Sequence, residues 1–227
     1  MFKLLITAVI ISLSSQTFSA SLEEKLEARR SKSQAKRPEN IKAVFSKQSK
    51  DLERSQILKK ALKEGVDAPS FNLNDKHISS FYKQGNVVVK FYRGGWCPYC
   101  MIELKEYQGY YSKFKERGCE IIALSPDLKI EIRKTKKKFD LEFPMYSDQE
   151  NKIAKKFGLA FALNKDILSI YKKFGIDLKK SQGNERNELP LPGTYVINKK
   201  GKIVYAYVNL DYTRRAEPSE VLKHCNN

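Results

Sequence analysis

The spacing of apolar residues changes character near residue 65. Residues 21–62 contain no glycine and a single proline, and the apolar positions of residues 49–65 recur at helical spacing. The last residue of this segment is a glycine, which commonly follows the final turn of a helix. The pattern predicts a helical extension in which residues 49–65 dock on the following domain, while residues 21–40 form a loose arm.

Beyond Val66, short apolar runs alternate with amphipathic ones. Asn-Lys-Lys-Gly at 198–201 separates the last two apolar runs and predicts a hairpin, and residues 158–190 have a less regular pattern. The expected strands cover residues 71–73, 87–92, 119–125, 143–146, 194–197 and 202–208, and the expected helices cover 98–115, 129–139 and 149–157. This order predicts an α/β fold with a central mixed β-sheet flanked by helices.

The first 20 residues have the pattern of a secretory signal peptide. Lys3 precedes an apolar run over residues 4–13, which small and polar residues follow. This run is roughly half of the 18 or more residues that a membrane-spanning helix needs, so a cleaved leader is expected rather than an anchor. The expected organisation is a leader at 1–20, an extension at 21–62 and a domain at 63–227, in a protein exported across the inner membrane to the periplasm.

The charge of the chain restricts its partners. The formal net charge is +17, and it falls by one, to +16, when Lys3 leaves with the leader. Nucleic acid is the usual partner of so basic a chain, but an exported protein meets little of it. We therefore expect an anionic envelope surface or acidic proteins as partners. The densest basic run, residues 129–138, is expected to be the solvated face of a helix.

Two of the four cysteines, Cys97 and Cys100, form a Cys-x-x-Cys motif. A zinc site needs two more ligands at matching spacing, but the two histidines of the chain are isolated. Haem attachment needs a histidine directly after the second cysteine, where this chain has Met101. No metal and no other cofactor is therefore expected, and the pair is interpreted as a redox-active dithiol.

The position of Cys97 favours a thiolate. It ends a turn between a strand and a helix, and Pro98 suits the first position of that helix. A helix dipole contributes at most about 2 kcal/mol, and one pKa unit corresponds to about 1.36 kcal/mol, so the helix alone lowers the pKa of a thiol by little more than one unit. A larger shift requires a hydrogen bond from Cys100, or a cation such as Lys90 or Arg93.

Two neighbours of the motif, Lys90 and Glu103, have alternative interpretations. Lys90 either lies beneath the sulfurs and supplies positive charge or a proton, or reaches water from the end of its strand. Glu103, one helical turn past Cys100, either relays protons or is an ordinary exposed glutamate. Trp96 and two glycines precede the pair, which a purely structural disulfide would not explain, and Tyr99 is expected on the exposed rim.

The other two cysteines are expected to be bystanders. Cys119 lies in a predicted strand and is expected to pack as a small apolar residue. Cys225, next to the C-terminus, is expected to be mobile, with a distant resolving thiol or a link between two chains as alternatives.

Four segments, residues 64–75, 91–104, 191–208 and 211–218, resemble the peroxiredoxin-like branch of the alkyl hydroperoxide reductase / thiol-specific antioxidant superfamily. The resemblance implies a thioredoxin-like fold and two possible nucleophiles. The peroxiredoxin pattern Pro-x-x-x-Thr-x-x-Cys, laid on residues 93–100, places Cys100 at the attacking position and Cys97 at the threonine. The thioredoxin pattern makes Cys97 the nucleophile and Cys100 the resolving thiol.

The resemblance also implies a cation that this sequence places differently. Peroxiredoxins commonly carry an arginine just before the strand that contains Thr194, but Pro192 stands near that position. Pro192 resembles the cis-proline with which thioredoxins dock substrate disulfides. The candidates to replace the arginine are Arg93, or Arg214 and Arg215 if the tail folds back.

These patterns predict an exported thiol oxidoreductase that reduces hydroperoxides. One cysteine attacks the peroxide and becomes a sulfenic acid, the other condenses with it, and an external dithiol reduces the resulting disulfide. The alternative is thioredoxin-like exchange with protein disulfides, in which Cys97 attacks. A third, non-enzymatic alternative is a basic envelope-binding module with a structural cysteine pair.

Overall fold

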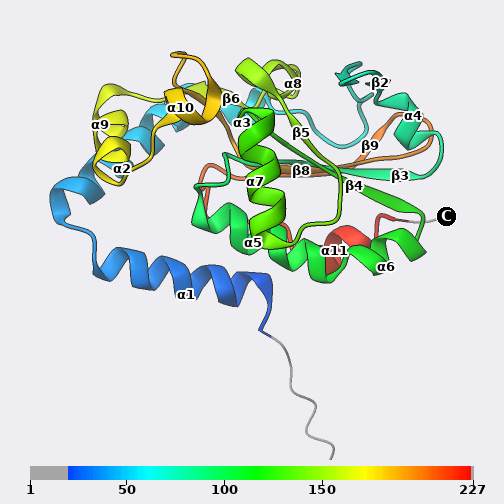
Figure 1. Ribbon diagram of the computed structural model, residues 1–227, viewed down its shortest axis with the longest axis horizontal. Helices are drawn as coiled ribbons and strands as arrows, with labels where there is room; N and C mark the ends of the chain where they lie inside the picture. Colours follow the sequence, from blue (N-terminus) through cyan, green and yellow to red (C-terminus); the bar gives the residue numbers. More distant parts are fainter. Residues whose placement is uncertain (1–19, 226–227) are drawn as a thin grey trace, which may run out of the picture.

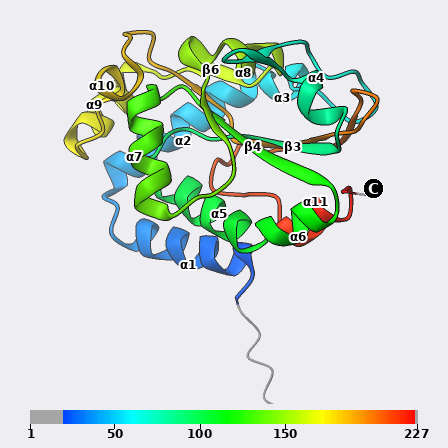
Figure 2. The same ribbon diagram turned by 45° about the vertical axis from the view of Figure 1, so that its right-hand side comes forward.

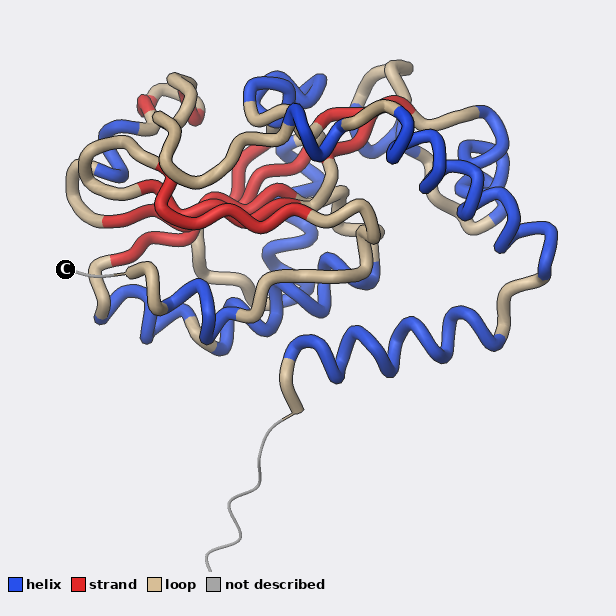
Figure 3. Tube along the Cα trace, turned by 180° about the vertical axis from the view of Figure 1, so that it is seen from behind, coloured by secondary structure: helices blue, strands red, loops and turns tan. Residues whose placement is uncertain are grey.

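The computed structural model describes residues 20–225, so the expected leader lies, apart from Ala20, outside the described residues. A five-stranded sheet of order β5-β4-β3-β8-β9 forms the centre of the molecule (Figure 1). β3, β4 and β5 are parallel, β8 runs antiparallel to β3, and β9 runs antiparallel to β8. The strands are β3 (Asn86–Phe91), β4 (Cys119–Ser125), β5 (Met145–Ser147), β8 (Gly193–Ile197) and β9 (Ile203–Val208). The predicted mixed sheet is confirmed, and Figure 3 shows it between helices on both sides.

The central strand β3 is buried along its whole length. Its side chains alternate between the two faces, as in any strand. Val87, Val89 and Phe91 join one apolar cluster, while Val88 and Tyr92 join the other. Lys90 has the same parity as Val88 and Tyr92, so it points to the face covered by α5 (Pro98–Gly109) and α6 (Tyr111–Glu116).

Two predicted helices are interrupted. The helix expected over residues 98–115 breaks at Tyr110, directly after Gly109, into α5 and α6. Glycine weakens a helix by about 1 kcal/mol relative to alanine, which explains the position of the break. The helix expected over residues 149–157 is a short 3₁₀ turn, η1 (Gln149–Asn151), followed by α8 (Lys152–Lys156). Positive φ angles at Glu150 and Asn151, the last two residues of η1, prevent a continuous helix.

The N-terminal extension forms α1 (Leu22–Ala35), α2 (Glu39–Arg54) and α3 (Ile57–Lys60). The expectation of a loose arm over residues 21–40 is wrong, because Leu22 and Leu26 are fully buried and α1 runs beside α5 (Figures 1 and 2). These leucines are four residues apart and lie on one face of α1. The Glu217 carboxylate also accepts hydrogen bonds from the first amides of α1.

The less regular segment between α8 and β8 contains secondary structure that the sequence did not predict. β6 (Ala160–Ala162) pairs with β7 (Glu188–Pro190), and α9 (Lys165–Lys173) and α10 (Leu178–Gln182) lie between them. Asn164 caps α9 by accepting a hydrogen bond from the amide of Ile167 at 2.9 Å. The remaining elements are β1 (Asn72–Leu73), β2 (Lys76–His77), α4 (Ser79–Tyr82), α7 (Lys129–Phe139) and α11 (Pro218–Leu222).

Cys119 and Cys225 form a disulfide, so both expectations for these residues are wrong. The C-terminal segment packs α11 against the α5 face of the sheet and brings the two Cα atoms to 5.6 Å. Cys225 is fully buried, and the Asn86 side chain donates to the carbonyl of His224 at 2.9 Å. Nothing local in the sequence indicates this pairing, because the two cysteines are 106 residues apart.

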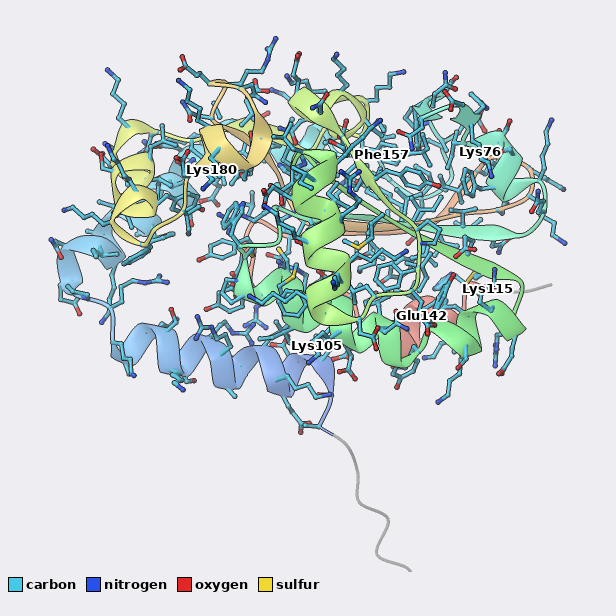
Figure 4. All side chains as sticks on the ribbon, viewed as in Figure 1. Lys76, Lys105, Lys115, Glu142, Phe157 and Lys180 are labelled. Carbon is cyan, nitrogen blue, oxygen red and sulfur yellow. A yellow bond between two sulfur atoms is a disulfide. The ribbon has the colours of Figure 1, made fainter. Side chains whose placement is uncertain are left out.

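The surface is rich in lysine. Figure 4 shows Lys76, Lys105, Lys115 and Lys180 projecting outward, whereas Phe157 lies inside against the sheet. Between residues 20 and 225, no helix is both long and apolar enough to cross a bilayer.

Candidate active site at the start of helix α5

The loop between β3 and α5 holds the cysteine pair. Gly94 has φ +151°, and a Cβ at this position would lie 2.3 Å from the Trp96 ring nitrogen, so the loop requires glycine. The amide of Gly95 donates to the Asp127 carboxylate at 2.9 Å and fixes the loop to the end of β4. Cys97 is the N-cap of α5, and Pro98 is its first residue, as predicted.

The two sulfurs lie 2.8 Å apart, with the Cys100 thiol donating to Cys97. Burial acts to raise the pKa of Cys97, but this hydrogen bond and the positive charges of Arg93 and Arg215 outweigh it and lower the pKa to about 6. Burial and the charge of its neighbour raise the pKa of Cys100 well above its ordinary value. Cys97 is therefore the sulfur that carries negative charge, and Cys100 is the proton donor beside it.

A buried ionic group lies beneath the pair. Lys90 donates to Glu103 at 2.8 Å, and Arg215 donates to the other oxygen of Glu103 at 2.7 Å. All three side chains are at most 2% exposed. Lys90 does not reach water and Glu103 is not an exposed glutamate, so both of these alternatives are wrong. The Glu103 carboxylate compensates two buried cations, each of which would be costly alone.

The C-terminal tail, residues 209–225, folds back and brings one of the two candidate arginines to the site. Arg215 Nη2 lies 3.5 Å from the Cys100 sulfur, and its guanidinium also donates to the carbonyls of Tyr212 and Arg214. The side chain of Arg214 instead pairs with Glu23 at the surface. Arg215, 21 residues after Thr194 in the chain (194 to 215), thus places a cation beside the cysteine pair.

Arg93 reaches the site from the other side. Its guanidinium carbon lies 4.3 Å from the ring centre of Tyr212, 5.2 Å from Trp96 and 5.7 Å from Tyr171. Arg93 is 5% exposed, and its Nε has no hydrogen-bond partner within the described part of the chain. Aromatic faces therefore hold this cation, which leaves its charge available to the Cys97 sulfur or to a bound anion.

A pocket of about 450 Å³ opens over Cys97. Cys97 is among its lining residues and Cys100 is not. Although Cys97 is only 1% exposed, it lines this pocket, so a small molecule in the pocket lies beside the residue with the lowered pKa. The walls come from α1, the connection from α1 to α2, α9 and the tail.

Three residues singled out from the sequence lie elsewhere than expected or play a different part. The peptide bonds of the described residues are all trans, so the likeness of Pro192 to a cis-proline is wrong. Leu191 and Pro192 simply link β7 to β8, and the Leu191 amide donates to the Leu159 carbonyl at 2.9 Å. Thr194 accepts a hydrogen bond from Lys90 at 2.9 Å. Tyr99 is buried rather than on the rim and packs edge to face on Tyr212.

Sequence reasoning missed Asp127, Tyr171 and Tyr212. Burial raises the pKa of Asp127 to about 6, while its hydrogen bond from the Gly95 amide acts in the opposite direction. A signal for Asp127 existed, since it comes two residues after a buried strand that is adjacent to the strand leading to the motif. Tyr171 carried no local signal, whereas Tyr212 lies in the family-like segment 211–218. Over residues 20–225, no three His, Cys, Asp or Glu side chains gather as metal ligands would.

Known proteins share the domain of this chain. The AhpC/TSA family pattern matches residues 65–206. Peroxiredoxin Q, chloroplastic, of Oryza sativa subsp. japonica is 32% identical over 160 residues, 69% of this chain and 64% of the relative. Thiol-disulfide oxidoreductase ResA of Bacillus thuringiensis subsp. konkukian is 29% identical over 144 residues, 62% of this chain and 66% of the relative. The chain thus spans about two thirds of the length of these relatives.

The fold also matches solved structures. Peroxidoxin BcpB from Mycobacterium tuberculosis superposes with a TM-score of 0.55 at 19% identity, covering 71% of this chain and 95% of the other. Reduced Prx3 from Vibrio vulnificus gives a TM-score of 0.56 at 15% identity, covering 72% and 98%. These likenesses concern the fold alone, and they agree with the thioredoxin-like architecture expected from the sequence. The chain belongs to the AhpC/TSA family.

Proposed function

We propose that this chain is an exported thiol peroxidase in which Cys97 attacks hydroperoxides and Cys100 resolves the product. The observation that carries the proposal is the recessed position of Cys97 at the pocket, with its pKa lowered to about 6. A slender hydroperoxide can reach this sulfur through the pocket. A folded protein that presents a disulfide needs a more exposed nucleophile, so the walls formed by α1 and α9 favour a small substrate.

The chemistry follows from the contacts of the two sulfurs. The Cys97 thiolate attacks one hydroperoxide oxygen, the O–O bond breaks, and the leaving alkoxide takes up a proton to become an alcohol. The thiol of Cys100 then attacks the Cys97 sulfenic acid, which forms the disulfide and releases water. A sulfur–sulfur distance of 2.8 Å, against about 2.0 Å in a disulfide, requires little movement for this step. An external dithiol then returns both sulfurs to the reduced state.

Two arginines are suited to assist the attack. Arg93 and Arg215 place positive charge next to the pair, where negative charge moves from sulfur to oxygen. Glu103 and Lys90 are positioning residues in this scheme, because they hold Arg215 and contact no reacting atom.

A second function, thiol–disulfide exchange, is favoured by a different observation. The lowered pKa belongs to the first cysteine of the motif and the raised one to the second, which is the order of the thioredoxin pattern. In this alternative, Cys97 attacks a substrate disulfide and Cys100 releases the mixed disulfide.

Rapid mixing of reduced protein with substrates distinguishes these functions. Trp96 is the one tryptophan of the chain and lies directly beside Cys97, so its fluorescence should report oxidation of the pair. We expect organic hydroperoxides to oxidise the pair faster than a disulfide-bonded protein substrate does. Fast exchange with the disulfide and slow reaction with every hydroperoxide would overturn the peroxidase and support the alternative.

Export and partners complete the proposal. The leader-like pattern of residues 1–20 supports export to the periplasm, and the Cys119–Cys225 disulfide is typical of an oxidising compartment. The partners would be a hydroperoxide, a dithiol reductant and an anionic envelope surface that attracts the basic chain.

A further inference from the structure

The buried ionisable groups around the cysteine pair include more cations than carboxylates. The cations, each at most 6% exposed, are Lys90, Arg93 and Arg215. The carboxylates, each at most 2% exposed, are Glu103 and Asp127. Three cations against two carboxylates leave a net charge of +1 when both acids are ionised. The group becomes neutral when Cys97 carries the negative charge of a thiolate.

Arg93 is the cation of this group that lacks a carboxylate. Lys90 and Arg215 share Glu103, whereas the guanidinium of Arg93 forms no ion pair and no hydrogen bond within residues 20–225. Its contacts are the ring faces of three aromatic residues. A buried cation without a counter-ion is unfavourable, and Arg93 is one of the two arginines whose charge acts on Cys97. The Cys97 thiolate is therefore the anion that compensates Arg93.

Oxidation of the pair removes this anion. A disulfide between Cys97 and Cys100 carries no charge, so its formation leaves Arg93 buried against aromatic faces alone. The new bond closes a loop of only a few residues, and a disulfide stabilises a fold less when its loop is short. The folded protein thus favours the dithiol over the disulfide. A disulfide whose reduced form is stabilised in this way is a strong oxidant.

We propose that the oxidised pair passes the oxidising equivalents of a hydroperoxide to cysteine pairs of other polypeptides and so forms disulfides in them. This inference rests on the proposed peroxidase function and names the class of dithiol that returns the pair to its reduced state. Cys97 is recessed at a pocket of about 450 Å³, so the incoming thiol has to lie on a flexible segment. Exported chains that have not yet folded carry such thiols, and we call them clients.

Two exchange steps transfer the electrons. A client thiolate attacks Cys97, the sulfur at the pocket, and forms a mixed disulfide while Cys100 leaves and takes up a proton. The second client thiolate then attacks the client sulfur of the mixed disulfide, and Cys97 leaves as a thiolate beside Arg93. The two client sulfurs are oxidised to a disulfide, and the pair gains both electrons. Of the two protons that the client thiols lose, one remains on Cys100 and the other goes to solvent.

The redox equilibrium with glutathione tests the inference without a hydroperoxide. Trp96 fluorescence follows the reduced fraction of the pair as the ratio of squared reduced to oxidised glutathione is varied at about pH 8. A peptide of residues 93–104, in which no group is buried, is the reference. We expect the folded protein to be half reduced at a ratio at least about tenfold lower than the peptide, because nearby cations favour the thiolate. An equal or higher ratio for the folded protein would overturn the inference.

A pair of matched variants tests the part of Arg93. Arg93→Met keeps an apolar chain against the aromatic faces but removes the charge, so the ratio at half reduction should rise about tenfold. The control, Arg133→Met, removes the same charge from an exposed position of α7 and should leave the ratio unchanged. Equal shifts in the two variants would overturn the assignment to Arg93. The comparison of unaltered protein with the peptide depends on neither variant.

Disulfide transfer separates this inference from the proposed function. Protein oxidised with diamide, which is not a hydroperoxide, is mixed with a reduced and unfolded small protein, and the loss of client thiols is measured. We expect this loss to be at least about tenfold faster than with an equal concentration of oxidised glutathione. Slower transfer, with organic hydroperoxides still oxidising the pair, would overturn the inference and leave the peroxidase intact. Fast transfer without reaction with any hydroperoxide would overturn the peroxidase and retain a thiol oxidant that needs another source of oxidation.

Discussion

Two cysteine pairs lie at opposite ends of the same parallel strands. Cys97 and Cys100 follow the end of β3, whereas Cys119 begins β4 beside the start of β3 and is bonded to Cys225. All four residues are at most 1% exposed, so burial does not distinguish the pairs. The first pair has two arginines nearby and a pocket over one sulfur, and the second has neither among its described contacts. Charge and access, rather than burial, set a reactive pair apart from a structural one.

The largest expected effect is loss of the proposed nucleophile. Cys97→Ser should lower peroxidase activity by at least about 10³-fold, because the attacking atom is removed. The matched control is Cys119→Ser/Cys225→Ser, which removes two sulfurs at the other end of the sheet and should retain most of the activity. Steady-state rates with an organic hydroperoxide measure both, and comparable losses would erase the distinction between the pairs.

Removal of the tail arginine should affect both stability and reactivity. Arg215→Met leaves the buried Glu103 with Lys90 alone, and breaking a buried ion pair typically costs about 3–5 kcal/mol of unfolding free energy. The same change should raise the pKa of Cys97, because a cation near the pair is lost. Urea unfolding and a pH titration of alkylation measure the two effects. Arg215→Lys is the control that retains the charge, and an unchanged Cys97 pKa in Arg215→Met would show that Arg215 does not act on the pair.

Loss of the remote disulfide should affect mainly stability. Cys119→Ala/Cys225→Ala should lower the free energy of unfolding by about 2–4 kcal/mol, since the bond restricts a long loop of the unfolded chain. Denaturant unfolding of this variant under non-reducing conditions tests the expectation. The pKa of Cys97 should stay near its original value, and a large rise would mean that the disulfide holds Arg215 in place.

A further expected effect is the pH dependence of stability. The folded pKa of Cys97, about 6, lies below the value of 9.0 for an ordinary thiol, so the unfolded chain binds more protons between these values. Stability from Cys97 is therefore complete above about pH 9 and is lost as the pH falls through about 6. Asp127 acts in the opposite direction, because its raised pKa makes its contribution fall as the pH rises through about 6.

A difference measurement isolates the contribution of Cys97. The unfolding free energy of reduced protein minus that of Cys97→Ser should increase from pH 6 to pH 9, because Asp127 contributes to both proteins. The bonded pair adds no such slope, since disulfide sulfurs do not titrate. A flat difference would contradict the lowered pKa.

The sequence predicted what depends on local patterns. Apolar periodicity located the five strands of the sheet within a few residues, and Pro98 placed Cys97 at the start of a helix. Lys90 lies two residues from both Val88 and Tyr92, so the alternation of side chains along a strand already indicated that Lys90 points to the face that α5 covers.

The rest depends on contacts between distant segments. The return of the tail, which brings Arg215 to the site and Cys225 to Cys119, is fixed by tertiary packing that no local window contains. The docking of α1 was missed because Leu22 and Leu26 are the two apolar residues that this highly charged helix buries. The cations that α1 and the α1–α2 connection add to the pocket over Cys97 depend on that docking.

The pH dependence of alkylation, followed separately at each cysteine, tests the central claim most directly. Cys100→Ser retains a hydrogen-bond donor to Cys97, and Cys97→Ser leaves Cys100 as the reactive candidate. The rate of iodoacetamide modification in Cys100→Ser should rise with pH around a midpoint of about 6, whereas Cys97→Ser should react only at a much higher pH. A low midpoint at Cys100, with an ordinary thiol pKa at Cys97, would contradict the account and assign the attack to Cys100.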